Sequence, residues 1–146
     1  MPQDTVVRPR RILLVEDDTE LRLAIVRSLR KISPTLEIDA VVSADEAFSR
    51  FRGDRQDVPG FDLVISDVVV PGERSGLDLW AFCQKRWPAT PFILVSGISE
   101  QLLLKELGPT DVRPTILSKT TAAGIMRKII ADLLALEDPH PKTVVV

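Results

Sequence analysis

The segment Ile12-Leu-Leu-Val-Glu-Asp-Asp18 joins four consecutive apolar residues directly to three acids. A short, continuous apolar run is typical of a strand that is covered on both faces, as strands of parallel sheets are. Ligands of open parallel sheets bind at the carboxyl ends of the strands. This segment therefore predicts a buried strand near the start of the chain and an acidic edge where that strand ends.

The chain outside this segment alternates between helical and strand patterns. Apolar residues recur at helical spacing from Leu21 to Ile32, and Pro34 ends that stretch. Further helices are expected over 44–52, 76–86, 99–107 and 121–136, and further strands over 36–42, 61–66, 92–95 and 115–117. Five strands alternating with five helices predict an α/β domain with a parallel sheet and helices on both of its faces.

Two of these elements carry more detailed predictions. The strand over 36–42 is expected to be a half-exposed edge strand, because its apolar positions alternate with mostly polar ones. Its expected inward residues are Leu36, Ile38, Ala40 and Val42. The sequence Ser43-Ala-Asp-Glu46 predicts a capping box at the start of the following helix.

The composition favours a single cytoplasmic domain. The 146 residues are 45% apolar and 27% charged, with a net charge of −2, which gives no electrostatic reason to expect nucleic acid or membrane partners. No apolar run approaches the ~20 residues of a membrane helix, and Cys83 is the only cysteine. We expect tails over 1–10 and 137–146, with the domain over 11–136.

Polar residues with complementary chemistry follow four of the five predicted strands. They are Glu16 and Asp17 after the first strand, Asp67 after the third, Ser96 after the fourth and Lys119 after the fifth. Carboxylates that converge at one edge repel each other unless a cation lies between them, and oxygen ligands of this kind suit Mg²⁺. Asp18 is expected to serve the start of the first helix and not the metal.

A phosphoryl group would fit this combination of residues. Asp67 is the expected nucleophile, because a carboxylate can form an acyl phosphate. Lys119 would pair with the phosphoryl oxygens, and Ser96 could donate a hydrogen bond to one of them or could serve only as turn chemistry.

With these positions the chain resembles the receiver domains of two-component response regulators, over roughly residues 10 to 136. The motifs that carry the resemblance are Ile12-Leu-Leu-Val-Glu-Asp-Asp18, Asp62-Leu-Val-Ile-Ser-Asp67, Pro71-Gly72, Ile93-Leu-Val-Ser-Gly97 and Leu117-Ser-Lys119. The resemblance implies a flavodoxin-like (βα)5 doubly wound sheet with strand order 2-1-3-4-5. It also implies phosphotransfer to Asp67 from a histidine kinase or phosphotransfer protein. In the metal site that it implies, Asp17 contacts Mg²⁺ directly, Glu16 acts through water, and Val69 contributes its backbone carbonyl.

The chain departs from the pattern of that family at several positions. Ile116 stands where the family often has a switching tyrosine or phenylalanine, and Thr120 stands where a proline usually follows the lysine, so a trans peptide is expected there. Val69 and Ile98 are apolar where family members often orient the hydrolytic water with polar side chains, which predicts slow loss of phosphate. The loop 67–76 is one residue longer than the commonest form and resembles that of receivers attached to hybrid histidine kinases.

Three other functions compete with this one. A phosphatase with an aspartyl nucleophile needs a second acid two residues later, where this chain has Val69. A flavodoxin-like electron carrier would have Ser, Thr and Gly in place of the acids after the first strand. A pseudo-receiver, which binds proteins without being phosphorylated, stays open because of Ile116 and Thr120.

The output of such a domain is expected to pass through protein contacts. Few residues follow Leu136, so a DNA-binding or enzymatic domain is not expected after it. A downstream protein would bind the face formed by the helix 99–107, the strand 115–117 and the helix 121–136. A homodimer is left open, as is the choice between a free-standing regulator and a segment of a larger kinase.

Overall fold

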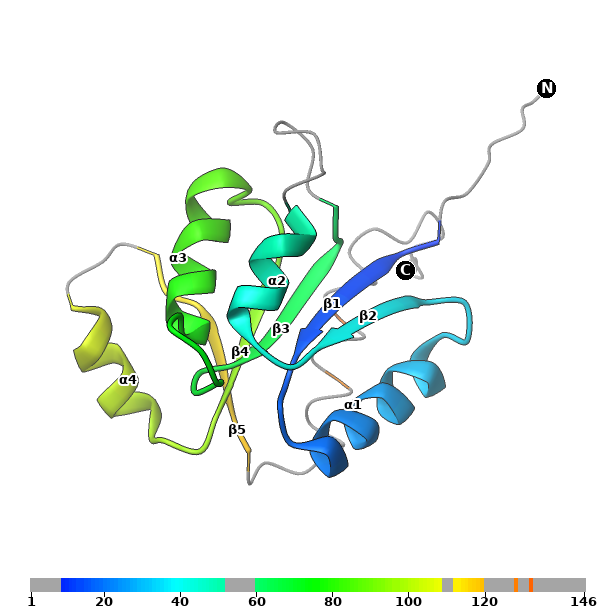
Figure 1. The fold of residues 1–146 in the computed structure, drawn as a ribbon, viewed down its shortest axis with the longest axis horizontal. Helices are drawn as coiled ribbons and strands as arrows, with labels where there is room; N and C mark the ends of the chain where they lie inside the picture. Colours follow the sequence, from blue (N-terminus) through cyan, green and yellow to red (C-terminus); the bar gives the residue numbers. More distant parts are fainter. Residues whose placement is uncertain (1–8, 52–59, 109–111, 120–127, 129–131, 133–146) are drawn as a thin grey trace, which may run out of the picture.

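The fold was obtained as a computed structural model that describes residues 9–51, 60–108, 112–119, 128 and 132. Its elements, in chain order, are β1 (Arg11–Val15), α1 (Thr19–Ile32), β2 (Glu37–Val41), α2 (Ala44–Phe51), β3 (Leu63–Asp67), α3 (Gly76–Arg86), β4 (Phe92–Ser96), α4 (Glu100–Leu107) and β5 (Thr115–Ser118). The strands form one sheet in the order β2-β1-β3-β4-β5 (Figure 1). Every neighbouring pair is parallel, which confirms the predicted flavodoxin-like arrangement.

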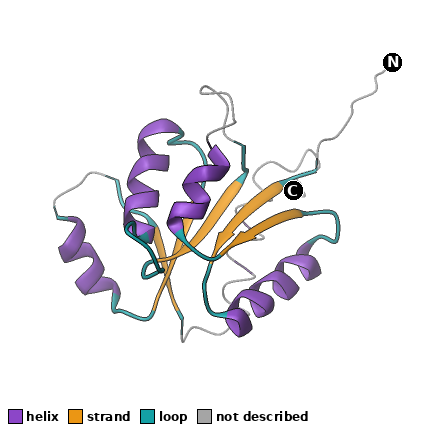
Figure 2. Ribbon diagram, viewed as in Figure 1, coloured by secondary structure: helices purple, strands orange, loops and turns teal. Residues whose placement is uncertain are grey.

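Helices cover both faces of the sheet (Figure 2). On one face α2, α3 and α4 pack against Leu13, Val15, Val64 and Leu94. On the other face α1 packs against Ile12, Leu14, Ile65 and Ile93. Neighbouring residues of one strand point to opposite faces, so β1, β3 and β4 need apolar residues at consecutive positions. The continuous apolar runs in the sequence follow from this double burial.

The helix termini are fixed by side chains that the sequence places there. Asp18 accepts a hydrogen bond from the Leu21 amide and caps α1, as predicted. Of the box predicted before α2, the half made by Ser43 forms, since its hydroxyl accepts from the Glu46 amide, while the Glu46 carboxylate accepts from the Val42 amide, one residue before the cap. These caps set the positions at which the loops of the acidic edge enter the helices.

Two details of the strands differ from the prediction. On β2 the buried valine is Val41, and Val42 is exposed because the strand has ended by that residue. β3 begins at Leu63 and not at Phe61, since Asp62 uses its carboxylate to accept the backbone N–H of Arg11. The predicted edge position of β2 is confirmed.

The remaining predictions about elements concern packing and the end of the chain. Trp80, Cys83 and Trp87 are buried in the core, and burial raises the pKa of the Cys83 thiol to about 12. The helix expected over 121–136 and the helix end expected at Gly53 lie outside the described residues. Within the described part of the chain, every helix is too short or too polar to cross a bilayer.

Candidate functional site

The three acids at the carboxyl ends of β1 and β3 form a cluster. One carboxylate oxygen from each of Glu16, Asp17 and Asp67 can be chosen so that all three lie within 4.8 Å of one another. Glu16 and Asp67 are buried, with 1% and 3% of their surface exposed, whereas Asp17 is open to solvent. Because like charges at such distances repel, the arrangement favours a cation.

Glu16 provides the clearest indication of what the cluster can hold. Its Oε2 accepts the backbone N–H of Asp18 at 3.0 Å and lies 3.8 Å from Lys119 Nζ. Its Oε1 is buried and has no hydrogen-bond partner among the described residues. Burial, followed by the charge of Asp67, raises the pKa of Glu16 above its ordinary value, although the Asp18 amide opposes this. A buried carboxylate oxygen without a partner fits a hard divalent cation, and together the three acids supply the oxygen ligands that such ions prefer.

Lys119 connects this cluster to β5. Its Nζ lies 2.6 Å from Asp67 Oδ2, and its backbone N–H donates to the carbonyl of Ser96 at 2.8 Å. Partial burial alone would lower the pKa of the Lys119 ammonium, but the hydrogen bond to Asp67 and the surrounding carboxylates outweigh it and raise the pKa. The ammonium is therefore charged and directed at the buried end of Asp67.

Ser96 is at the edge of the same site but makes local contacts. Its hydroxyl accepts the N–H of Ile98 at 2.8 Å and lies 3.0 Å from the Ile98 carbonyl, to which it can donate. These are the turn contacts that were the alternative for this residue. The Ser96 side chain is buried, and the Ser96 backbone carbonyl accepts the backbone N–H of Lys119.

The backbone around Asp67 is packed closely against the start of α3. A Cβ atom on Gly76 would lie 2.0 Å from the carbonyl oxygen of Asp67, so this position accepts no side chain without a shift of the backbone. The Gly76 N–H donates to the Val68 carbonyl, and the Val69 N–H donates to Asp67 Oδ1 at 3.2 Å. The orientation of the central carboxylate is thus held by its own loop.

Two residues that contact this site were not identified from the sequence. Arg22, one turn into α1, donates from Nη1 to the Glu16 carbonyl at 2.8 Å and so braces the turn that carries the first two acids. Gly76 was expected only to start a helix. The spacing between Asp18 and Arg22 places arginine one helical turn after the cap, which is the signal that could have indicated the first contact.

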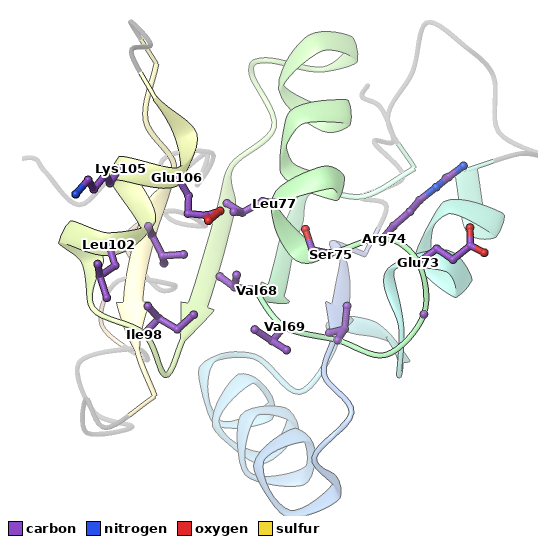
Figure 3. Close-up of a pocket in the computed structure, with 13 residues that line it drawn as sticks. Val68, Val69, Glu73, Arg74, Ser75, Leu77, Ile98, Leu102, Lys105 and Glu106 are labelled. Atoms are coloured by element: carbon purple, nitrogen blue, oxygen red, sulfur yellow. The ribbon is translucent and has the colours of Figure 1, made fainter.

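An open groove of about 620 Å³ lies between the loop after β3 and helix α4 (Figure 3). Its apolar lining includes Val69, Ile98 and Leu102, which expose 64%, 40% and 57% of their surface. Lys105 and Glu106 of α4 stand at its margin. Water in this groove therefore meets apolar side chains at Val69 and Ile98, the two apolar positions that the sequence predicts to slow the loss of phosphate.

The other departures from the family pattern are only partly described. Ile116 is partly buried and packs against the core that α2, α3 and α4 share, so it occupies a packing position although it is not fully enclosed. Thr120 and the peptide that precedes it lie outside the described residues.

Comparison with known proteins gives consistent matches. The model of the response regulator receiver domain family matches residues 12–131. The chain is 31% identical over 128 residues to the sensor kinase CckA of Brucella abortus and 26% identical over 135 residues to the response regulator protein PilR of Pseudomonas aeruginosa. These alignments cover 87% and 90% of this chain but only 13% and 27% of those relatives, so the chain corresponds to a small part of each.

Solved structures share the fold over most of their length. A response regulator receiver protein from Sinorhizobium medicae superposes with a TM-score of 0.71 at 21% identity, covering 86% of this chain and 94% of that one. The non-phosphorylated HemR receiver domain of Leptospira biflexa gives 0.66 at 26% identity, with 90% and 98% coverage. The response regulator protein TrrA of Thermotoga maritima, solved in complex with Mg²⁺-BeF, gives 0.67 at 24% identity, with 85% and 98% coverage.

Proposed function

Because this chain belongs to the family of response regulator receiver domains, we propose that Asp67 accepts a phosphoryl group from a phosphohistidine of a histidine kinase or phosphotransfer protein. The observation that carries the proposal is the 2.6 Å contact between Asp67 and Lys119 inside a buried acidic cluster. The pseudo-receiver alternative is not favoured, because a binding module that is never phosphorylated has no need for this expensive arrangement of buried charges.

The metal site proposed for this reaction uses Glu16, Asp17, Asp67 and the backbone carbonyl of Val69. The orphaned oxygen of Glu16 and the exposed carboxylate of Asp17 support the fit to Mg²⁺. A bound Mg²⁺ would neutralise part of the negative charge that the phosphoryl oxygens bring into the cluster.

The transfer itself places demands on the protein's own groups. A carboxylate oxygen of Asp67 attacks phosphorus, the N–P bond of the phosphohistidine breaks, and the imidazole leaves with the electron pair of that bond. The ammonium of Lys119 moves from the attacking carboxylate to the phosphoryl oxygens. The Ser96 hydroxyl donates a hydrogen bond to another of these oxygens, in place of its hydrogen bond to the Ile98 carbonyl. Positioning and charge neutralisation are the whole of the catalysis in this scheme.

The proposed output is a protein contact on the face of α4 and β5; the helix expected over 121–136, which is part of the predicted contact face, lies outside the described residues. CckA, a sensor kinase, and PilR, a response regulator, represent the two settings in which a relative occurs.

Intact-mass analysis after incubation with acetyl phosphate and Mg²⁺ tests the proposal. The wild-type protein is expected to gain the mass of one phosphoryl group, and Asp67→Asn is expected to gain none. Asp62→Asn is the matched control, since this acid precedes the same strand but holds the Arg11 amide, and it should gain the phosphoryl group normally. Equal labelling of the wild type and Asp67→Asn, or none of the wild type, would overturn the proposal.

A further inference from the structure

Asp45, in the first turn of α2, contacts the tip of the loop that carries Val69. Its Oδ2 accepts the backbone N–H of Glu73 at 3.1 Å, and its Oδ1 lies 3.9 Å from Nε of Arg74. Gly72 has a positive φ of 104°, and a Cβ at that position would lie 2.4 Å from Asp45 Oδ2. The loop therefore turns directly against this carboxylate, at a position that only glycine fills without strain.

Arg74 strengthens the same contact from the loop side. Its guanidinium lies over the ring of Phe48, one turn further along α2, at 4.2 Å from the ring centroid. Phe48 in turn packs edge-to-face against Phe82 of α3 at 5.0 Å. Figure 3 shows Arg74 extending from the loop toward α2 and away from α4. The tip of the loop is thus attached to a packed aromatic pair that joins two helices.

The base of the loop is held by separate contacts. The Val68 N–H donates to the Val95 carbonyl of β4, and the Val68 carbonyl accepts from Gly76. Val69 lies between this fixed base and the fixed tip, and its backbone N–H donates a hydrogen bond to Asp67 Oδ1. A loop that is held at both ends leaves few conformations to the residue between them, so the contacts of Asp45 bear on the orientation of Val69.

We propose that Asp45 is a positioning residue for the phosphoacceptor site: it holds the loop tip so that the main chain of Val69 faces the acidic cluster. This inference rests on the proposed function, in which Val69 contributes its carbonyl to the Mg²⁺ site. Asp45 touches neither the metal ligands nor the nucleophile, and it acts through Glu73, Arg74 and the loop.

A simpler role for Asp45 is to improve α2 through the helix dipole, which favours acids in the first turn. That role requires no contact with the Glu73 amide, and it would affect the stability of the helix without affecting metal binding. The ion pair with Arg74 is half exposed on both sides and is expected to contribute little alone. The hydrogen bond to the loop backbone is therefore the contact on which the proposal depends.

The test compares Asp45→Ala, Asp45→Asn and Asp39→Ala. Asp39→Ala is the matched control, because Asp39 pairs with Arg50 of the same helix at 2.9 Å but makes no contact with the loop. Isothermal titration calorimetry gives the Mg²⁺ affinity of the unphosphorylated proteins, hydrogen exchange reports on the Glu73 amide, and thermal unfolding shows that each variant is folded.

Asp45→Ala is expected to weaken Mg²⁺ binding by roughly tenfold, the low end for loss of a residue that supports metal ligands, and to speed exchange of the Glu73 amide. Asp45→Asn keeps an oxygen acceptor for that amide and should recover most of the affinity, and Asp39→Ala should match the wild type. Unchanged Mg²⁺ affinity in folded Asp45→Ala, while the wild type binds and is phosphorylated, would overturn this inference alone. Failure of the wild type to bind Mg²⁺ would overturn the proposed function with it.

Discussion

Glu16 is buried, and one of its carboxylate oxygens has no hydrogen-bond partner among the described residues. This arrangement destabilises the folded protein when no ion is bound. The raised pKa of Glu16 means that the folded protein holds the proton on this carboxyl more tightly than the unfolded chain does. The associated stability is therefore fully present below the ordinary carboxyl pKa and is lost as the pH rises through the raised pKa. When it is ionised, the Glu16 carboxylate opposes folding and at the same time makes a place for a cation.

Glu16→Gln removes the buried charge and keeps the size of the side chain, so it is expected to stabilise the ion-free protein at neutral pH. It is also expected to weaken Mg²⁺ binding. Urea unfolding in the presence of a chelator should show an advantage of the variant that grows as the pH is raised above the acidic range. Glu20→Gln is the control, because this exposed first-turn acid favours α1 and its loss should destabilise slightly. A Glu16→Gln protein that is less stable than the wild type at neutral pH would contradict this account.

The residues of the site could be predicted from the sequence because they come at the ends of predicted parallel strands, whose carboxyl ends lie at one edge of a sheet. Asp67 and Lys119 both come directly at or after such strands, and the structure places their side chains in contact. The partner of Lys119 in this state is the carboxylate itself, and the Ser96 hydroxyl is engaged by Ile98. The contact of Ser96 is the turn alternative that the sequence offered, whereas the contact of Lys119 with Asp67 could not be predicted, because it depends on side-chain geometry at distances well below the precision of a pattern.

At the scale of elements, the two loops after β3 and β4 present apolar side chains to the groove next to α4. Val69 exposes 64% of its surface and Ile98 exposes 40%, and both line the groove next to α4. Neither side chain can orient or deprotonate a water molecule, which is the contribution that general bases make to hydrolysis. If Asp67 is phosphorylated as proposed, these loops are expected to leave the acyl phosphate long-lived.

The phosphorylated protein is expected to lose its phosphate with a half-life of minutes or longer. Val69→Gln, which offers a polar group to water at the same position, should shorten that half-life. Val42→Gln is a suitable control, since Val42 is similarly exposed at the end of β2 but lies outside the groove. Mass-based decay after removal of acetyl phosphate measures all three. Loss of phosphate from the wild type within seconds would show that the apolar loops do not protect it.

The bounds predicted for α3, Gly76 and Arg86, are confirmed, and in the structure a capping box between Ser75 and Asp78 fixes its start. The prediction was less accurate at β2, where Val41 and not Val42 is buried. An edge strand is specified by one neighbour only, so its alternation leaves open where the strand ends and which residue turns inward. The first residues of β3 were misplaced for a different reason, since Asp62 is used as a side-chain acceptor.

At the scale of the whole molecule, Mg²⁺ binding and folding should be coupled. The acids of the site come from β1 and β3, so the cluster exists only when the sheet is assembled. A ligand that binds only the folded state stabilises it, by about 1.4 kcal/mol at ten times its dissociation constant. Thermal unfolding of the wild type should therefore shift upward with Mg²⁺. Asp67→Asn should shift much less, and an equal shift in both would place the ion elsewhere.

The sheet order could be predicted because the family motifs fix it, and the structure confirms it. The close approach of Gly76 to the Asp67 carbonyl could not, because one glycine among seven carries no sign of which backbone it will meet. Contacts between elements that are distant in the sequence arise only once the layers are assembled, so they cannot be predicted from a single sequence.

The ion pair between Lys119 and Asp67 affects how strongly free anions bind at this site. A lysine with no counter-charge at the mouth of an α/β sheet would attract inorganic phosphate and other free anions. Here the ammonium is already neutralised by a carboxylate 2.6 Å away, so a dissolved anion has to compete with a buried partner that is always present. A phosphoryl group bonded to Asp67 does not face that competition, because forming the bond removes the rival charge. The pairing thus makes the site selective for covalent modification over mere occupancy by the anions of its surroundings.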